Sequence, residues 1–156
     1  MWESKVSVEI EAPIDQVYRR LADFTRHSDF SDGLAMVEQT SDAPIGVGTG
    51  FRAEETVPGK YVSYSEVTAL EEPRLIAWKA WVEGVMRTEW EFRLTRSEAG
   101  TRLVQVSRWQ AAGPIGFLML HLHRKRNAPR ENRRTLDRIK SVMEAEAPAE
   151  PAEVTR

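Results

Sequence analysis

The segment GPIGFLMLHLHRKRNAPRENRRTLDRIKSVMEAE, residues 113–146, decides the fold, because its spacing is that of one long helix near the end of the chain. Counted at about 100° per residue, one face of this helix is apolar at both ends and polar in the middle. The apolar residues are Ile115, Leu118, Leu122 and Leu136, and the polar ones are Lys125 and Asn132. Since buried polar groups need partners, this pattern favours a helix that closes a partly hydrated cavity.

Two features of this helix stay open at the level of sequence. Lys125 can extend its charge into solvent, and Asn132 can bind a backbone carbonyl, in which case neither marks a cavity. Pro129 cannot donate a hydrogen bond to the carbonyl of Lys125, so the helix either bends at this point or splits into two.

The same segment argues against a membrane span, a metal site and a nucleic-acid interface. The apolar run Ile115–Leu122 is far shorter than the ~20 residues that cross a bilayer. His121 and His123 project about 200° apart on a helix, so they cannot share one metal ion. Basic residues dominate positions 124–140, but no aromatic residue lies among them to stack on a base. We therefore expect no integral membrane segment, no metal, no cofactor and no nucleic-acid partner.

Upstream of this helix the chain has the pattern of a β-sheet. Six segments rich in β-branched and aromatic residues lie at 35–40, 48–57, 60–70, 74–82, 86–95 and 101–110. Short turn signals separate them, so neighbouring strands are expected to pair antiparallel. VSVEI at 6–10 alternates like a seventh strand, and a helix follows it from Pro13, with a further helical turn within 25–33.

Length and composition indicate one globular domain. The chain has 156 residues, a formal net charge of −2 and no cysteine, which fits a cytoplasmic protein without disulfides. The N-terminal residues contain no continuous apolar segment, so we expect no signal peptide. We predict a domain over residues 1–144 and a disordered, acidic tail over 145–156.

The order of these elements resembles the helix-grip fold of the START-like superfamily, also known as the polyketide cyclase/dehydrase or Bet v 1-like superfamily. The resemblance rests on VSVEIEAPIDQVYRRLADF, GVGTGFR, RLIAW, TEWEFRLT, GTRLVQV and the closing helix, which together cover residues 5–143. It implies an α+β fold in which a seven-stranded curved antiparallel sheet wraps a long C-terminal helix, with two short helices after the first strand.

The resemblance also implies that a hydrophobic or amphipathic small molecule, such as a lipid, a quinone or a polyketide, binds between sheet and helix. Predicted lining residues from the strands are Phe51, Tyr64, Trp78, Met86, Trp90, Phe92, Leu103 and Arg108. Those from the helix are Leu118, Leu122, Lys125, Asn132 and Leu136. Lys125, Asn132 or Arg108 would orient the polar end of the ligand. The face of strand 101–110 stays open: either Leu103, Gln105, Ser107 and Trp109 point inward, or Val104, Val106 and Arg108 do.

Two alternatives to simple binding stay open. The first is a polyketide cyclase or dehydratase in which Tyr61, Tyr64 or Arg108 polarises a carbonyl. Aromatase/cyclases of the superfamily commonly carry Trp-Pro after the first helix and an arginine on the fourth strand, whereas this chain has His27-Ser28 and no arginine in YVSYSEVTAL. The second is a module that binds a protein partner through the basic helix face. A homodimer is a further open alternative.

Overall fold

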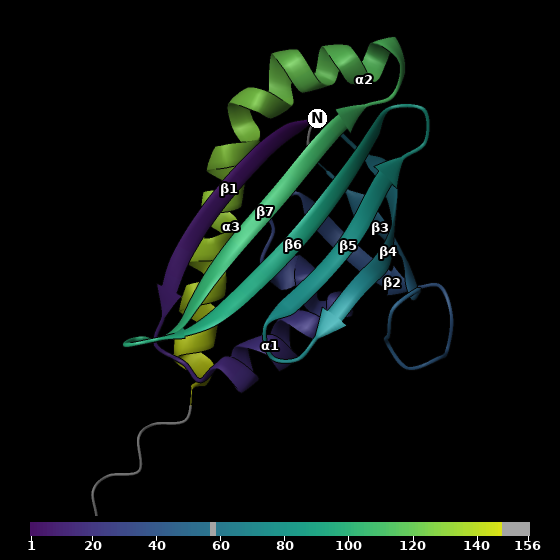
Figure 1. The fold of residues 1–156 in the computed structure, drawn as a ribbon. Coiled ribbons are helices and arrows are strands. Elements are labelled where there is room, and N and C mark those ends of the chain that lie inside the picture. The colour runs from purple at the N-terminus through teal and green to yellow at the C-terminus, as the bar shows by residue number, and fades with distance from the viewer. Residues whose placement is uncertain (57–58, 148–156) are drawn as a thin grey trace, which may run out of the picture.

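In the computed structural model, which describes residues 1–56 and 59–147, a curved antiparallel sheet wraps around a long helix (Figure 1). The strands are β1 (Trp2–Ile10), β2 (Leu34–Gln39), β3 (Gly50–Glu55), β4 (Tyr61–Glu71), β5 (Leu75–Val82), β6 (Met86–Ser97) and β7 (Gly100–Ala111). Their order across the sheet is β1-β7-β6-β5-β4-β3-β2, and every neighbouring pair is antiparallel. The predicted helix-grip fold with seven strands is confirmed.

The inner face of β7 follows the first of the two alternatives left open by the sequence. Leu103, Gln105, Ser107 and Trp109 are buried toward the concave side of the sheet. Arg108 therefore lies on the convex side, where it pairs with Glu3 and Glu91. Shifts of register at Leu34/Met36 and Val67/Ala69 mark bulges, which add to the bend and twist of the sheet.

The two short helices expected after the first strand are α1 (Ile14–Ala22) and the 3₁₀ turn η1 (Phe24–Asp29). Pro13 precedes α1 with extended backbone angles, and Asp15 lies in the first turn, where the helix dipole favours an anion. Val17 and Leu21 are fully buried one helical turn apart, so α1 covers one end of the concave face.

The C-terminal segment is one continuous run of helix with an irregular turn near its start. α2 (Gly113–Met119) passes into a π-helical turn, η2 (Leu120–Arg124), and then into α3 (Lys125–Glu146). Figure 1 shows the direction changing between α2, which lies across the end of the sheet, and α3, which runs down its concave side. The chain does not split at Pro129, which lies inside α3.

The core consists of two clusters at opposite ends of the concave face. The larger one joins α1 and η1 to the C-terminal half of α3 and includes the fully buried Leu21, Leu136 and Ile139. The smaller one joins η2 and the start of α3 to β6 and β7, and contains Met86 and Trp109. Because one helix is narrower than the sheet that surrounds it, space remains between the two clusters.

The last turn of α3 is fixed by hydrogen bonds to the carboxylate of Glu144. α3 ends at Glu146, and its last turn is held by Glu144, which accepts a hydrogen bond from the Glu11 backbone at 2.8 Å. Lys140 also donates to Glu144 at 2.8 Å, and both hydrogen bonds hold the pKa of that carboxyl below its usual range. The rest of the predicted tail, residues 148–156, lies outside the described residues.

We predict opposite outcomes for two leucines that the sequence places on one helix face. Leu136→Ala removes a side chain with no exposed surface and should lower the free energy of unfolding by about 2–5 kcal/mol. Leu118→Ala, whose side chain is 58% exposed, should change it by less than about 0.5 kcal/mol. Denaturant unfolding measures both values, and an equal loss in the two variants would contradict this arrangement of the helix.

Candidate functional site

A cavity of about 570 Å³ lies between the concave face of the sheet and α3, at the place that the two core clusters leave unfilled. It is lined by η1, the segment that follows it, β2 to β7, α2, η2 and α3. Phe24, Phe92 and Ile139 border it from the larger cluster, and Met86 and Trp109 from the smaller one. The volume is within the roughly 300–1,000 Å³ typical of small-molecule sites.

One wall of the cavity is aromatic. Trp78 on β5 and Trp90 on β6 are paired directly across the two strands, and their rings lie parallel with centroids 6.0 Å apart. Trp109 on β7 meets Trp90 edge to face at 5.4 Å, and Phe92 packs on Trp78 at 5.1 Å. This row follows from alternation along the strands, which puts every second residue on the concave side. It offers flat apolar surface to a ligand with rings.

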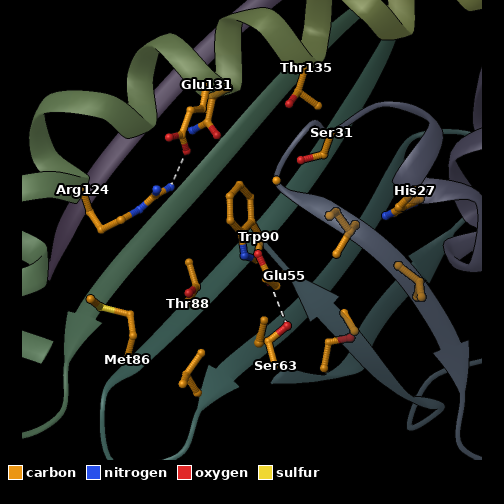
Figure 2. Close-up of a pocket in the computed structure, with 18 of the residues that line it drawn as sticks. His27, Ser31, Glu55, Ser63, Met86, Thr88, Trp90, Arg124, Glu131 and Thr135 are labelled. Atoms are coloured by element: carbon orange, nitrogen blue, oxygen red, sulfur yellow. Dashed lines mark hydrogen bonds and ion pairs between the residues drawn. The ribbon is translucent and has the colours of Figure 1, made fainter. Parts of the chain in front are cut away.

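Another part of the lining is polar, and its residues come from both the sheet and the helix. Glu55 at the end of β3 accepts a hydrogen bond from Ser63 at 2.7 Å and another from the Tyr61 hydroxyl at 3.3 Å. Arg124 pairs with Glu131 at 2.8 Å, and its guanidinium lies over the Trp109 ring at 4.7 Å from the centroid. Figure 2 shows these two groups with Trp90 between them in the view.

Glu55 is the cavity carboxylate with the least charge compensation. Asp32, which also lines the cavity, pairs with Arg134 and Arg138, and Glu131 pairs with Arg124. Within residues 1–56 and 59–147, no cation lies within 4.0 Å of Glu55. Burial raises the pKa of Glu55, although the hydrogen bonds from Ser63 and Tyr61 lower it in part. Burial and the neighbouring Glu55 carboxylate raise the pKa of Tyr61, so its hydroxyl stays protonated and donates.

A second polar group lies deeper, beneath α3. Asn132 donates to Ser107 at 3.1 Å, and the Trp109 indole donates to the same hydroxyl at 3.0 Å. Gln105 is 4% exposed, and its side-chain oxygen has no hydrogen-bond partner among the described residues. Since an unpartnered buried acceptor is costly, this oxygen is suited to accept a hydrogen bond from a bound molecule.

His27 lines the cavity next to the aromatic wall. Its Nε2 is 2.7 Å from the Leu21 carbonyl, so Nε2 carries the proton and donates, and Nδ1 of the neutral ring can only accept. Burial lowers the pKa of His27, and the ring packs on Phe24 at 4.7 Å between centroids. His27 is thus a neutral acceptor within an aromatic cluster. Among the described residues, no group of three or more metal-ligating side chains is placed to hold a metal ion.

Five of the residues predicted from the sequence line the cavity: Trp78, Met86, Trp90, Phe92 and Asn132. Phe51, Leu103 and Leu136 are instead core residues of the larger cluster. Tyr64 is 42% exposed and stacks on Trp81, because alternation along β4 turns Ser63 and Ser65 inward in its place. Arg108 lies on the convex face, as described above, and does not reach the cavity.

The predictions for the start of the helix were wrong, and the π-helical turn is the reason. Leu118 and Leu122 are 58% and 67% exposed, and Lys125 does not line the cavity. The residues buried in a row are Gly116, Leu120, Arg124, Ala128, Asn132 and Leu136. A π-helical turn holds more residues than an α-helical one, so a count at 100° per residue loses phase across η2.

Glu55, Arg124 and Glu131 are among the polar lining residues that were not predicted. The sequence does contain a signal for Glu55. Phe51, Ala53 and Glu55 are alternate residues of β3 and therefore share the face that points inward. Arg124 had no such signal in the sequence, because its burial depends on the irregular turn η2, of which it is the last residue.

Among the described residues no helix is long and apolar enough to cross a membrane.

Solved structures with the same fold include proteins of little sequence similarity. TTHA0849 from Thermus thermophilus superposes with a TM-score of 0.74 at 17% identity, over 94% of this chain and 100% of that one. The Zhui aromatase/cyclase from Streptomyces sp. R1128 gives a TM-score of 0.68 at 19% identity, over 94% and 99%. The di-domain aromatase/cyclase StfQ of the steffimycin biosynthetic pathway gives 0.71 at 13% identity, over 92% of this chain and 50% of StfQ.

No curated protein matches the chain. The family model described as polyketide cyclase / dehydrase and lipid transport matches residues 1–144, which is nearly all of the sequence. This match agrees with the helix-grip topology and with the cavity between sheet and helix. The chain therefore belongs to the polyketide cyclase / dehydrase and lipid transport family.

Proposed function

We propose that the protein binds an amphipathic small molecule with a flat ring system, without a covalent bond, in the cavity under α3. The observation that carries this proposal is the composition of the lining: a cavity of about 570 Å³ is lined by a row of three tryptophans and, beside this row, by polar side chains from the sheet and the helix. Rings of a ligand would stack on Trp78 and Trp90, where burial of aromatic surface supplies most of the affinity.

The polar end of the ligand would lie against Glu55, Ser63 and the Arg124–Glu131 pair. In this proposal these residues orient the polar end of the ligand, the role predicted from the sequence for Lys125 and Arg108. Among the described residues, Glu55 has no cation within 4.0 Å and the side-chain oxygen of Gln105 has no hydrogen-bond partner, which favours a ligand that carries a hydroxyl or another hydrogen-bond donor. Quinol and polyphenol rings have this combination of flat apolar surface and donor groups.

A second candidate is a cyclase or dehydratase reaction on the bound molecule. The observation that favours it is the raised pKa of Glu55, since a carboxyl with a raised pKa more readily takes up a proton, which it can then donate to a substrate oxygen. β4, the fourth strand, carries no arginine, and the arginine nearest to this role, Arg124, comes from the helical side instead. The aromatase/cyclase Zhui shares the fold with this chain at 19% identity, which supports the architecture alone.

We predict that Trp90→Ala weakens binding of the uncharged ring probe N-phenyl-1-naphthylamine by about tenfold, because the central ring of the aromatic wall is lost. Probe fluorescence measures the affinity, and unfolding is followed alongside it. Trp90→Phe keeps a smaller ring and should recover part of the affinity. Tyr64→Ala, which removes an aromatic ring from the outer face of the sheet, is the matched control and should bind like the wild type. Equal affinity of Trp90→Ala and Tyr64→Ala would reject the cavity as the binding site.

We predict that Glu55→Gln stabilises the fold at pH 7 to 8 relative to the wild type. A carboxyl whose pKa is raised in the folded state holds its proton more tightly than in the unfolded chain, so stability falls as pH rises through the interval between the two pKa values. Glutamine does not ionise and escapes this loss. The advantage of the variant should therefore shrink as pH is lowered toward about 4, below the ordinary pKa of glutamate.

The neighbouring residue supplies the control for this experiment. Glu54 is exposed on the opposite face of β3 and pairs with Arg52 at 3.3 Å, so Glu54→Gln should show no such gain. Denaturant unfolding across this pH range gives both curves. A Glu55→Gln advantage that grows at low pH would mean that the carboxylate, and not the neutral acid, is the form that the fold prefers.

A further inference from the structure

α2 and the turn after it carry large apolar side chains on the outside of the molecule. Ile115, Phe117, Leu118 and Leu122 are 69%, 60%, 58% and 67% exposed, and we call these four residues the α2 patch. Isolated exposed apolar residues are ordinary, but four within two turns of one helix form a contiguous group of the kind that marks an interaction site. Figure 1 shows that α2 lies beyond the ends of β1 and β7, at the edge of the molecule.

The α2 patch cannot turn inward without displacing the helix. Gly116, on the opposite side of α2, lies against the turn between β5 and β6, where an added Cβ would come within 1.6 Å of the Val85 carbonyl oxygen. The Ala112 backbone also donates to this carbonyl at 2.9 Å. Met119 and Leu120 fill the inward side of the same helix. The exposed position of the patch is therefore fixed by close packing behind it.

A group of unpaired cations follows the α2 patch along the same outward line. Arg126 and Arg130 continue the four-residue spacing of Leu118 and Leu122, and both are exposed. Within the described part of the chain, neither arginine makes an ion pair within 4.0 Å. The sequence has no Asp or Glu between Glu98 and Glu131, so this end of the molecule is basic although the whole chain has a net charge of −2.

We propose that the α2 patch and the adjoining Arg126 and Arg130 form a docking surface for a membrane that contains anionic lipids. Apolar side chains on one short helical segment enter the boundary between headgroups and acyl chains, and cations beside them contact the phosphates; this pairing is what interfacial helices use. The surface does not include the tryptophans or the polar residues that contact the ligand in the proposed function. Ile115 and Met119 also line the cavity, so docking would bring this end of the cavity to the lipid.

A second copy of the chain is a less suitable occupant for this surface. Stable protein interfaces use roughly 20–30 residues on each side, whereas α2 has 7 residues and its patch has four exposed apolar side chains. A twofold dimer through α2 would also bring Arg126 and Arg130 of both copies near one another, and like charges there would oppose association.

The test is flotation of the full-length protein with vesicles. We expect it to float with vesicles of equal parts phosphatidylcholine and phosphatidylglycerol, and roughly tenfold less with phosphatidylcholine alone or in high salt. Phe117→Ser combined with Leu118→Ser should reduce the bound fraction about tenfold, because the membrane-inserting surface is lost. Met36→Ser combined with Val47→Ser removes two apolar residues that are exposed elsewhere and should not change binding.

A second pair of variants, one test and one control, examines the arginines of this surface. Arg126→Glu with Arg130→Glu should abolish binding to anionic vesicles, while Arg87→Glu with Arg96→Glu, which makes the same change of charge from exposed positions on β6, should leave most of it. Absence of binding to anionic vesicles, or equal loss in test and control variants, would overturn the proposal. Sedimentation equilibrium without lipid gives the oligomeric state. A dimer that the double variant Phe117→Ser with Leu118→Ser dissociates would also overturn the proposal. Probe binding in the absence of vesicles tests the cavity separately, so either proposal can fail alone.

Discussion

The mismatch in width between one helix and a strongly curved seven-stranded sheet governs this structure. The sheet has seven strands spaced about 4.8 Å apart and is therefore about 29 Å wide, while a helix with its side chains is about 10–12 Å across. α3 can therefore pack on only part of the concave face. α1 and η1 fill one end, η2 and the start of α3 fill the other, and the middle is left to side chains that line the cavity without meeting across it.

The same mismatch explains why polar residues occur where a packed core would exclude them. Removing a charge from water is expensive unless it is paired, and here Arg124 is compensated by Glu131 and by the face of Trp109. Glu55 accepts hydrogen bonds from the hydroxyls of Ser63 and Tyr61, which offset only part of the rise in its pKa that burial causes. A fold selected for stability alone would do better with apolar residues at these positions. Their presence beside a row of tryptophans is more readily explained by a bound molecule than by folding.

Much of the architecture could be predicted from the sequence, because strands and turns are encoded locally. Alternation of apolar residues and short turn signals indicated all seven strands, and the length of the last apolar stripe indicated the closing helix. The residues of the site were harder to predict from the sequence. Trp78, Trp90 and Phe92 were found because strand residues two apart share a face. Leu118 and Leu122 were misplaced because the π-helical turn, a tertiary feature without a local signature, changes the phase of the helix. Glu55 was overlooked although its place on β3 follows from the same alternation.

The parallel arrangement of Trp78 and Trp90 gives the protein an optical property of its own. Two indoles that face each other in the lining, with a third edge-on, are close enough for their electronic transitions to couple. Their combined near-ultraviolet circular dichroism and emission depend on the spacing and polarity around the rings, and we expect both to change when a molecule packs against the rings or water leaves the cavity. The chain thus carries an intrinsic spectroscopic sensor of cavity occupancy, and no label has to be attached to read it.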